Sequence, residues 1–260
     1  MPGQVPLSVV ILTKNEAARI ADCLQSVAWA EDILVVDDES TDETERIAES
    51  FGARVLRRKM DIEGRHRNWA ASQANHEWVL SLDADERVTP ELAREIQGLL
   101  ANGAPYETYA IPRRNYIGQQ WIRHGGWYPS AQLKLFKKSV FQWEETTVHP
   151  RAISDRPWGT LHHDLIHYSY RDRADFIAKQ DGHTTREAQK WLMDGRRVSL
   201  AKALWRTVDR VVRSYFLKQG FRDGAVGVFV AWMAAKYQWV SYRKYREAKR
   251  QPRGSGRRET

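Results

Sequence analysis

Two aspartates, Asp83 and Asp85, are the clearest candidates for chemistry in this sequence. They are separated by one residue and directly follow the apolar run 78–82 (WVLSL), which predicts a buried strand. Two carboxylates at this spacing can hold a hard divalent cation, and that cation can bridge the two phosphates of a nucleoside diphosphate. The competing interpretation is a solvated acidic turn in front of a helix that begins near Thr89. The position directly after a strand favours the metal site.

A second acidic pair, Asp37 and Asp38, ends another apolar run at residues 32–36 (DILVV). An acid at the end of a parallel strand can accept hydrogen bonds from the ribose or the base of a nucleotide. Alternatively, these acids only complement the dipole of the helix that follows them. Both interpretations remain open from the residues alone.

Residues 13–16 (TKNE) close the first apolar run, and they include no glycine. A Rossmann dinucleotide site and a P-loop both need a glycine-rich turn at this point, and neither fingerprint occurs anywhere in the chain. A nucleotidyltransferase would likewise need a glycine-rich, arginine-containing loop here. The sequence therefore disfavours these three classes of nucleotide-binding protein.

The first hundred residues alternate between short apolar runs and segments with helical spacing of apolar residues. This alternation predicts an α/β fold with a mostly parallel sheet flanked by helices. Ligands of such sheets bind beyond the carboxyl ends of the strands, so we expect the three polar segments to meet in one site. The expected strands are residues 7–12, 32–36, 53–56 and 78–82, and the expected helices are residues 16–27, 42–51, 65–74 and 90–100.

The C-terminal part of the chain differs in composition. From Ala201 onward it has 15 Lys and Arg against 4 Asp and Glu, whereas the whole chain has a net charge of +8. Residues 106–170 predict short strands and loops, and the pattern becomes helical from about residue 171. We therefore expect a catalytic domain at residues 1–170, a basic and aromatic helical extension at 171–250, and a disordered tail at 251–260.

A basic segment implies an anionic partner. No nucleic-acid module is recognisable, which disfavours nucleic acid. Residues 228–240 are almost wholly apolar and aromatic, yet they are too short to cross a bilayer. We expect this segment to lie in the interface of an anionic membrane. The alternative is a helical hairpin that packs on the catalytic core.

The single cysteine, Cys23, excludes an intramolecular disulfide and favours a reducing compartment. The first residues have neither a basic leader nor a long apolar stretch, so we expect no secretory signal there. With the membrane interpretation above, this predicts a cytoplasmic protein, peripheral on the inner face of the cell membrane.

Three motifs of the sequence resemble the family 2 inverting glycosyltransferases of GT-A fold. They are residues 9–16 (VVILTKNE), 34–42 (LVVDDESTD) and 81–86 (SLDADE), in this order. Later segments are similar to the bacterial subgroup that includes the lipopolysaccharide core β-glucosyltransferases, which extends the resemblance over most of the chain. These segments are residues 126–129 (GWYP), 133–138 (LKLFKK), 148–149 (VH), 166–169 (IHYS) and 220–224 (GFRDG).

The resemblance implies a GT-A domain that binds a UDP-sugar as donor, with Mg2+ or Mn2+. Asp83 and Asp85 would flank this ion, with Asp85 favoured as the direct ligand, and His167 would be a further ligand. The alternative for His167 is a hydrogen-bonded structural histidine. Residues that would line the donor site are Thr13, Asn15 and Glu16 in the nucleotide pocket, Asp37 or Asp38 at uracil or ribose, and Arg67 near the donor.

An inverting transfer also needs a group that takes the proton of the acceptor hydroxyl. The subgroup usually reads Val-His-Glu at a position where this chain has Val148, His149 and Pro150, so the acid is missing. Glu144 or Glu145 would supply the base from the same loop, and His149 is a weaker candidate. The alternative for each glutamate is an ordinary surface acid.

The sequence thus predicts transfer of a hexose, glucose from UDP-glucose in the first instance, with inversion. The expected acceptor is a lipid-linked saccharide such as the inner core of lipopolysaccharide. Two other interpretations remain. A polyprenyl-phosphate glycosyltransferase would share everything up to Asp85, and a catalytically inactive nucleotide-sugar-binding protein would explain Pro150.

Overall fold

The computed structural model describes residues 5–146 and 150–250, and these divide into two compact units. The described residues of the first unit lie within Met1–Asn115 and Tyr128–Ser169. Those of the second lie within Tyr116–Trp127 and Tyr170–Thr260, so residues 116–127 group with the C-terminal helices rather than with the sheet. The functional division into domains remains a prediction, as does the tail 251–260, which lies outside the described residues.

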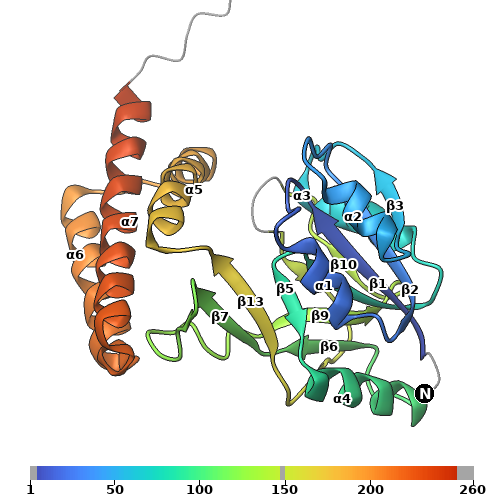
Figure 1. The fold of residues 1–260 in the computed structure, drawn as a ribbon. Helices are drawn as coiled ribbons and strands as arrows, with labels where there is room; N and C mark the ends of the chain where they lie inside the picture. The colour runs from blue at the N-terminus through green and yellow to red at the C-terminus, as the bar shows by residue number, and fades with distance from the viewer. Residues whose placement is uncertain (1–4, 147–149, 251–260) are drawn as a thin grey trace, which may run out of the picture. The chain divides into compact units, whose positions relative to one another are not determined.

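A seven-stranded sheet forms the centre of the first unit (Figure 1). Four of its six strand pairings are parallel, and β9 is the strand that runs antiparallel to both neighbours. This is a mostly parallel sheet, as the sequence predicts. From one edge to the other the strands are β12 (Gly159–Thr160), β6 (Thr108–Ile111), β9 (Gln132–Lys137), β4 (Trp78–Asp83), β1 (Val5–Thr13), β2 (Ala30–Asp37) and β3 (Arg54–Arg57).

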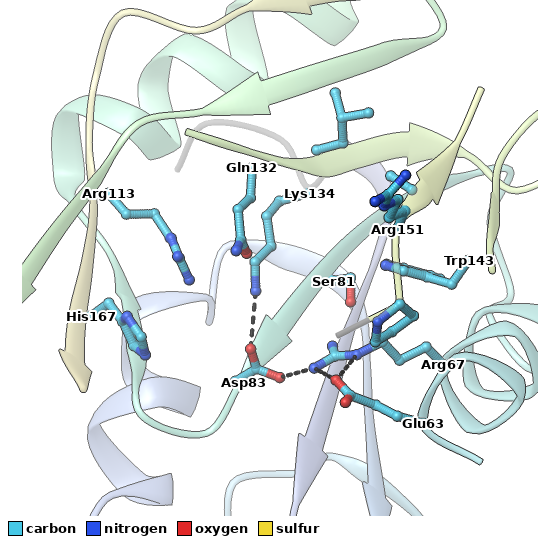
Figure 2. Close-up of a pocket in the computed structure, with 13 residues that line it drawn as sticks. Glu63, Arg67, Ser81, Asp83, Arg113, Gln132, Lys134, Trp143, Arg151 and His167 are labelled. Atoms are coloured by element: carbon cyan, nitrogen blue, oxygen red, sulfur yellow. Dashed lines mark hydrogen bonds and ion pairs between the residues drawn. The ribbon is translucent and has the colours of Figure 1, made fainter. Parts of the chain in front are cut away.

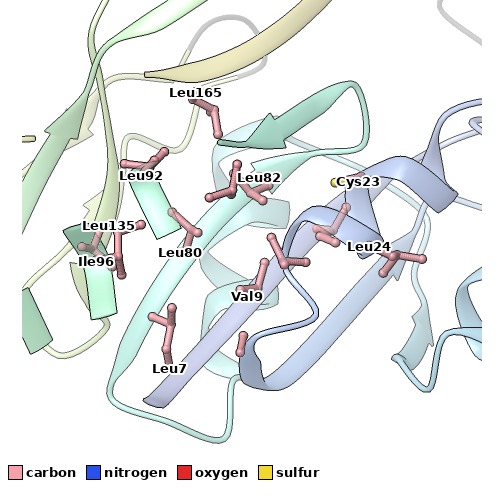
Figure 3. Packing of buried hydrophobic residues seen from close by; sticks show 14 of the residues in the cluster. Leu7, Val9, Cys23, Leu24, Leu80, Leu82, Leu92, Ile96, Leu135 and Leu165 are labelled. Carbon is pink, nitrogen blue, oxygen red and sulfur yellow. The ribbon is translucent and has the colours of Figure 1, made fainter. Parts of the chain in front are cut away.

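The central strands bury both faces, which explains their continuous apolar runs. Alternate residues of β1 enter two separate cores: Leu7, Val9 and Ile11 belong to one cluster, and Val10 to the other. The first cluster, shown in Figure 3, is completed by Leu80 and by residues of the covering helices. The second includes Val36, Val79 and Phe136. Each buried Leu or Val contributes about 1.5–3 kcal/mol, so the two cores together fix the strand order.

Four helices connect the strands of this unit near the positions that the sequence predicts. The first begins at Ile20 rather than near residue 16. Residues 17–19 form a turn, and the backbone N–H groups of Glu16 and Ala17 donate to the side chains of Thr44 and Asp42. The fourth helix begins as expected, because Thr89 Oγ1 accepts a hydrogen bond from Leu92 N and Pro90 occupies its first turn. The helices are α1 (Ile20–Ser26), α2 (Thr44–Ser50), α3 (Glu63–Ser72) and α4 (Pro90–Ala101).

Two smaller strand pairs lie beside the end of β4. β5 (Glu86–Val88) pairs with β13 (Leu165–Tyr170) in antiparallel register, and this pairing sets His167 opposite Glu86. β10 (Gln142–Trp143) pairs with β11 (Ala152–Ile153). The sheet that contains β5 and β13 continues through β7 (Arg113–Ile117) to β8 (Gln120–Trp121). The first pairing brings His167, far away in sequence, next to the Asp83–Asp85 turn.

The second unit is helical. Its α5, α6 and α7 contact one another around two apolar clusters, one that contains Phe176 and Met233 and one that contains Trp191 and Tyr245. Between α6 and α7 the chain turns through a π-helical and a 3-10 segment. The bounds are α5 (Arg173–Met193), α6 (Leu200–Val211), η1 (Val212–Leu217), η2 (Gly220–Asp223) and α7 (Gly224–Arg250).

Residues 228–240, expected to lie in a membrane interface, are one stretch of α7. Val230, Ala231, Met233 and Ala235 are buried there, whereas Trp232 is exposed. This segment therefore packs mainly within its own unit, as expected for a helical hairpin. In the part of the chain that the structure describes, none of the helices combines the length and hydropathy that a bilayer-crossing helix needs.

The stability of the sheet edge depends on Asp32, a buried carboxylate on β2. It accepts hydrogen bonds from Ser8 Oγ (2.6 Å), Asn75 N (3.1 Å) and Arg54 Nε (2.9 Å). Burial by itself would raise the pKa of Asp32, but the hydrogen bonds from Arg54, Ser8 and Asn75 outweigh this effect and lower it below its ordinary value. The carboxylate thus joins β1, β2, β3 and the turn before β4.

We predict that Asp32→Ala lowers the free energy of unfolding by about 1–3 kcal/mol at neutral pH, because buried donors lose their acceptor. A lowered folded-state pKa stabilises the protein above the unfolded pKa of about 4, and this contribution is lost as the pH falls through the folded value. Urea denaturation of both proteins should therefore show a gap that narrows in acid. The control is Glu31→Ala, a change of a half-exposed neighbour. A gap that is constant with pH would contradict the role given to the Asp32 charge.

Candidate active site

A cavity of about 560 Å³ opens at the carboxyl end of β4 (Figure 2). Its walls come from α3, β4, β7, β9, β13 and the β10–β11 pair, so it gathers residues that are far apart in sequence. Charged and polar side chains dominate the lining. The lining residues are Glu63, Arg67, Ser81, Asp83, Arg113, Gln132, Leu133, Lys134, Trp143, Pro150, Arg151, Ala152 and His167.

Asp83, the last residue of β4, lies between two cations. Its Oδ1 accepts a hydrogen bond from Arg67 at 3.0 Å, and its Oδ2 accepts one from Lys134 Nζ at 3.2 Å. Burial would raise the pKa of Asp83, but the charges of Arg67 and Lys134 outweigh it and hold the pKa far below its usual range. Asp83 is therefore ionised at any physiological pH, and it holds Arg67 and Lys134 in place.

Arg67 extends from α3 into the cavity, as the resemblance implies for a residue near the donor. It also contacts Glu63 at 3.2 Å, four residues earlier on the same helix. Burial would lower the pKa of its guanidinium, but the charges of Asp83 and Glu63 raise it above its ordinary value. The side chain is thus a permanent, fixed cation at the cavity wall.

Asp85 follows in the turn after β4, and its carboxylate is only partly satisfied. Its Oδ1 is buried and has no hydrogen-bond partner among the described residues. Its Oδ2 lies 3.5 Å from His167 Nε2 and 3.7 Å from Arg19. A buried carboxylate oxygen without a partner is costly, so a cation at this point would relieve an existing penalty.

His167 on β13 is oriented by a hydrogen bond from its other ring nitrogen. Its Nδ1 lies 2.8 Å from Asn115 Oδ1 and 3.0 Å from Ser169 Oγ. An amide oxygen only accepts, so Nδ1 donates to Asn115, and Nε2 is the ring nitrogen that faces Asp85. A carbonyl oxygen behind one ring nitrogen is the usual support of a metal-binding histidine. His167 is thus a hydrogen-bonded histidine with one nitrogen left for a ligand.

Asp85 and His167 supply two ligands, and the residues that the structure describes contain no group of three or more His, Cys, Asp or Glu side chains fit to hold an ion. Mg2+ is commonly held by one or two carboxylates, with the remaining positions taken by substrate phosphates and water. The pair therefore fits an ion that binds together with a phosphorylated substrate. The residues do not form a closed structural metal centre.

The two other polar loops are bound to each other at the ends of β1 and β2. Asp37 is fully buried and accepts hydrogen bonds from the backbone nitrogen (2.6 Å) and the hydroxyl of Ser40. Ser40 Oγ accepts one from Asn15 N at 2.7 Å, and Asn15 Oδ1 accepts one from Thr41 N at 2.8 Å. Asp37 and Asn15 therefore fix the shape of the loops that carry the predicted nucleotide pocket.

Asp38 is bound from two sides, by Lys14 Nζ at 2.9 Å and by Met60 N at 2.7 Å. Burial would raise the pKa of Asp38, but the Met60 and Lys14 contacts outweigh it and lower the pKa. Thr13 Oγ1 is buried without a hydrogen-bond partner among the described residues, and Glu16 N donates to Thr44 Oγ1 at 2.9 Å. Arg67, Asp83 and His167 line the cavity. The other predicted site residues of these loops and of the turn after β4 do not: Thr13, Asn15, Glu16, Asp37, Asp38 and Asp85.

Glu144 and Glu145, the two candidates for the base, follow β10. Neither lines the cavity, and Glu145 pairs with Arg65 at 3.2 Å on the exposed surface. Their neighbours Trp143 and Arg151 do line it. Because the two glutamates do not, the geometry does not favour either as the base, and the assignment remains a prediction. The third candidate, His149, lies outside the described residues.

The cavity residues Lys134 and Arg113, and their buried partner Glu86, were not singled out as site residues from the sequence. Glu86 is fully buried and accepts hydrogen bonds from Lys134 Nζ (2.6 Å), Arg113 (3.4 Å) and Asp83 N (2.9 Å). Lys134 belongs to the segment 133–138, which the resemblance identified without giving it a role. In the sequence, the only indication for Glu86 is its position directly after Asp85 in the segment 81–86. Arg113 carried no sequence signal.

Comparison with known proteins agrees with this geometry. Residues 8–156, more than half of the chain, match the family described as Glycosyl transferase family 2. The chain belongs to this family. The fold class and the resemblance that the motifs predicted are thereby confirmed, with a GT-A-like mixed sheet flanked by helices and a long C-terminal helix.

Two curated relatives extend over nearly the whole chain. An uncharacterized glycosyltransferase of Rickettsia bellii (strain RML369-C) is 27% identical over 254 residues, which are 93% of this chain and 86% of that protein. The lipopolysaccharide core biosynthesis glycosyltransferase LpsC of Rhizobium meliloti (strain 1021) is 23% identical over 251 residues, which are 94% of this chain and 93% of that protein.

A solved structure is similar over a smaller region. Glucosyl-3-phosphoglycerate synthase from Mycobacterium tuberculosis, in complex with Mn2+, UDP and glucosyl-3-phosphoglycerate, is 22% identical with a TM-score of 0.37. The similarity covers 43% of this chain and 44% of that chain.

We predict that Asn115→Leu weakens Mn2+ binding in the presence of UDP by about 10–100-fold, because His167 loses the acceptor that fixes its ring. The measurement is titration of Mn2+ followed by its electron paramagnetic resonance. Asn68→Leu, which instead removes hydrogen bonds to the backbone of Trp143, is the matched control. Equal affinities of the Asn115 variant and the unaltered protein would contradict the orienting role.

Proposed function

We propose that this family 2 glycosyltransferase is metal-dependent and inverting, and that it transfers a hexose, in the first instance glucose from UDP-glucose, to a lipid-linked saccharide. The observation that carries the proposal is the carboxylate of Asp85. Its buried Oδ1 has no hydrogen-bond partner among the described residues, and its Oδ2 lies 3.5 Å from Nε2 of His167, which lines a cavity together with Arg67 and Lys134. An ion that binds with a diphosphate would complete this arrangement.

Asp85 and His167 would hold Mg2+ or Mn2+, with Asp83 facing Arg67 and Lys134 instead. When bound, the ion would neutralise the negative charge that develops on the leaving diphosphate. Arg67 is placed to donate to the same phosphates, because Asp83 and Glu63 fix its position without taking all of its five donors. Fixed donors of this kind stabilise the transition state without reorganisation.

The nucleoside would lie over the loops that follow β1 and β2. Asp38 is held there by Lys14 and Met60, and its position at the end of a parallel strand suits a ribose or base contact. The sugar would then extend into the cavity beneath Lys134 and Trp143. In the transfer, the acceptor hydroxyl forms the new bond to the anomeric carbon while the bond to the diphosphate breaks and a base takes the hydroxyl proton.

A lipid-linked acceptor, such as the inner core of lipopolysaccharide, is supported by the similarity to LpsC, whose name places that protein in lipopolysaccharide core biosynthesis. Such an acceptor and a nucleotide-sugar donor meet at the cytoplasmic side of a membrane. We therefore propose that the protein is cytoplasmic and peripheral on the inner face of the cell membrane.

A catalytically inactive sugar-nucleotide-binding protein is the second candidate. The observation that favours it is the placement of Glu144 and Glu145 outside the cavity lining, because neither is then in reach of an acceptor there. A polyprenyl-phosphate glycosyltransferase would use the same donor site, and acceptor assays distinguish it.

We predict that Asp85→Asn lowers Mn2+-dependent UDP binding by at least about tenfold, because a charged ligand is lost. Thermal melting with UDP and Mn2+, and hydrolysis of UDP-glucose, are the measurements. Asp22→Asn, a change of an exposed acid on α1, should leave both unchanged. Stabilisation of the Asp85 variant equal to that of the unaltered protein would refute this ligand, and no response to any nucleotide diphosphate would refute the enzyme.

The two glutamates are distinguished by separate Glu144→Gln and Glu145→Gln variants. We predict that the residue acting as base loses about 100-fold or more in the rate of transfer while it keeps UDP binding, whereas the other variant keeps both. Steady-state rates with a lipopolysaccharide acceptor provide the measurement. Full activity of both variants would exclude each as the base and move the assignment to another residue.

A further inference from the structure

α6 and η1 carry an exposed apolar stripe. Leu200, Leu204, Val208, Val212 and Phe216 recur at intervals of four residues, which places them along one side of the helix. Their side chains are 40–59% exposed. Two still more exposed residues extend this stripe: Trp205 (68%) and Leu217 (71%). We call these seven residues the α6–η1 face.

The other side of the same helix is packed. Ala203 is buried in a cluster with Trp191 and Tyr242 from α5 and α7, and Ser214 of η1 is buried as well. Close packing continues at the start of α7, where a Cβ on Gly227 would lie 1.8 Å from Gly220 O. The orientation of α6 and η1 is thus fixed by their own unit, and the exposed stripe faces outward because its opposite side is occupied.

Cations border this face. Residues 197–222 contain seven Lys or Arg and a single acid, Asp209, which is hydrogen-bonded to Arg213 at 2.7 Å. Within the described residues, no carboxylate pairs with Lys202, Arg210 or Lys218. Long cationic side chains beside an apolar stripe can lay their stems on it and extend their charges outward.

We propose that the α6–η1 face docks on an anionic lipid surface, with its apolar side chains at the boundary of headgroups and acyl chains and its cations on the headgroups. An amphipathic helix with Trp, Phe and Leu on one face and Lys and Arg beside it is the usual form of such a site. This assigns the lipid contact to residues 200–217 rather than to 228–240, of which only Val228, Trp232 and Lys236 are exposed.

Charge decides between a lipid surface and a second copy of the chain. A twofold dimer would bring each face against itself, so Lys202, Arg210 and Lys218 of one copy would meet the same cations of the other. Repulsion of like charges disfavours that arrangement, whereas anionic headgroups neutralise the same residues. The charge pattern therefore matches lipid.

The test uses the full chain and flotation with vesicles of phosphatidylcholine alone or mixed with phosphatidylglycerol. We expect flotation with the mixed vesicles. The triple variant Trp205→Gln, Val208→Gln, Phe216→Gln should bind at least about tenfold more weakly, because the buried apolar area is lost without a change in charge. Trp158→Gln, which changes a 55% exposed tryptophan of the first unit, is the matched control and should float as before.

A second variant, Lys202→Gln with Arg210→Gln, tests the charges without altering the apolar stripe. Binding to the mixed vesicles should fall about tenfold, with little change on phosphatidylcholine alone. If the triple variant does not fold, this charge variant still tests whether the α6–η1 face binds anionic lipid. Absence of flotation of the unaltered protein, or equal flotation of the charge variant, would overturn the proposal.

Sedimentation equilibrium without vesicles tests whether the α6–η1 face instead binds a second copy of the chain. A dimer that the triple variant disrupts would assign the face to a second copy and overturn the lipid assignment. Hydrolysis of UDP-glucose in vesicle-free buffer should be the same in all variants. This readout separates the docking face from the proposed function, because flotation is independent of catalysis and hydrolysis is independent of lipid.

Discussion

The ion-paired position of Asp83 is the constraint on which the candidate site depends. Arg67 from α3 and Lys134 from β9 each contact one oxygen of this carboxylate, so a single residue links a helix and two strands. Glu86 binds Lys134 from behind and accepts the backbone N–H of Asp83. Removing one member of such a buried group leaves an uncompensated charge, which is more costly than the pair itself is stabilising. The group therefore acts as one unit.

This charge group also explains why β9 runs antiparallel within the sheet. A further parallel strand beside β4 would have continued the pattern of apolar runs and crossover helices. β9 instead returns from the segment after β7 and brings Lys134 to the end of β4. On the other side, α3 approaches the backbone of Glu144 so closely that a Cβ on Gly64 would lie 1.9 Å from Glu144 O. The pairing of β9 with β4 and the packing of α3 against Glu144 thus form two walls of the cavity.

The strands and their polar ends were predictable, because buried parallel strands have continuous apolar runs and the acids follow them directly. The cavity beyond β4 was not. Arg113 and Gln132 line it, and Glu86 contacts Arg113 from its buried position; these residues come together only through the antiparallel pairings of β9 and β13, which have no local sequence signature. His167 was identified by resemblance, and its partner Asn115 is 52 residues away in sequence. The start of α1 was wrong, because the backbone N–H groups of Glu16 and Ala17 bind the side chains of Thr44 and Asp42, which no local pattern announces.

The two carboxylates of the turn after β4 have opposite electrostatic environments, and this difference separates their roles. Both oxygens of Asp83 are already bound by cations, so a metal ion there would be repelled by the charges of Arg67 and Lys134. Asp85 has one buried oxygen without a hydrogen-bond partner among the described residues, and its other oxygen lies 3.5 Å from His167 Nε2 and 3.7 Å from Arg19. A buried unsatisfied oxygen persists only if something offsets its cost, and here binding an ion offers that compensation. The fold thus leaves Asp85, not Asp83, ready to accept positive charge from outside the chain.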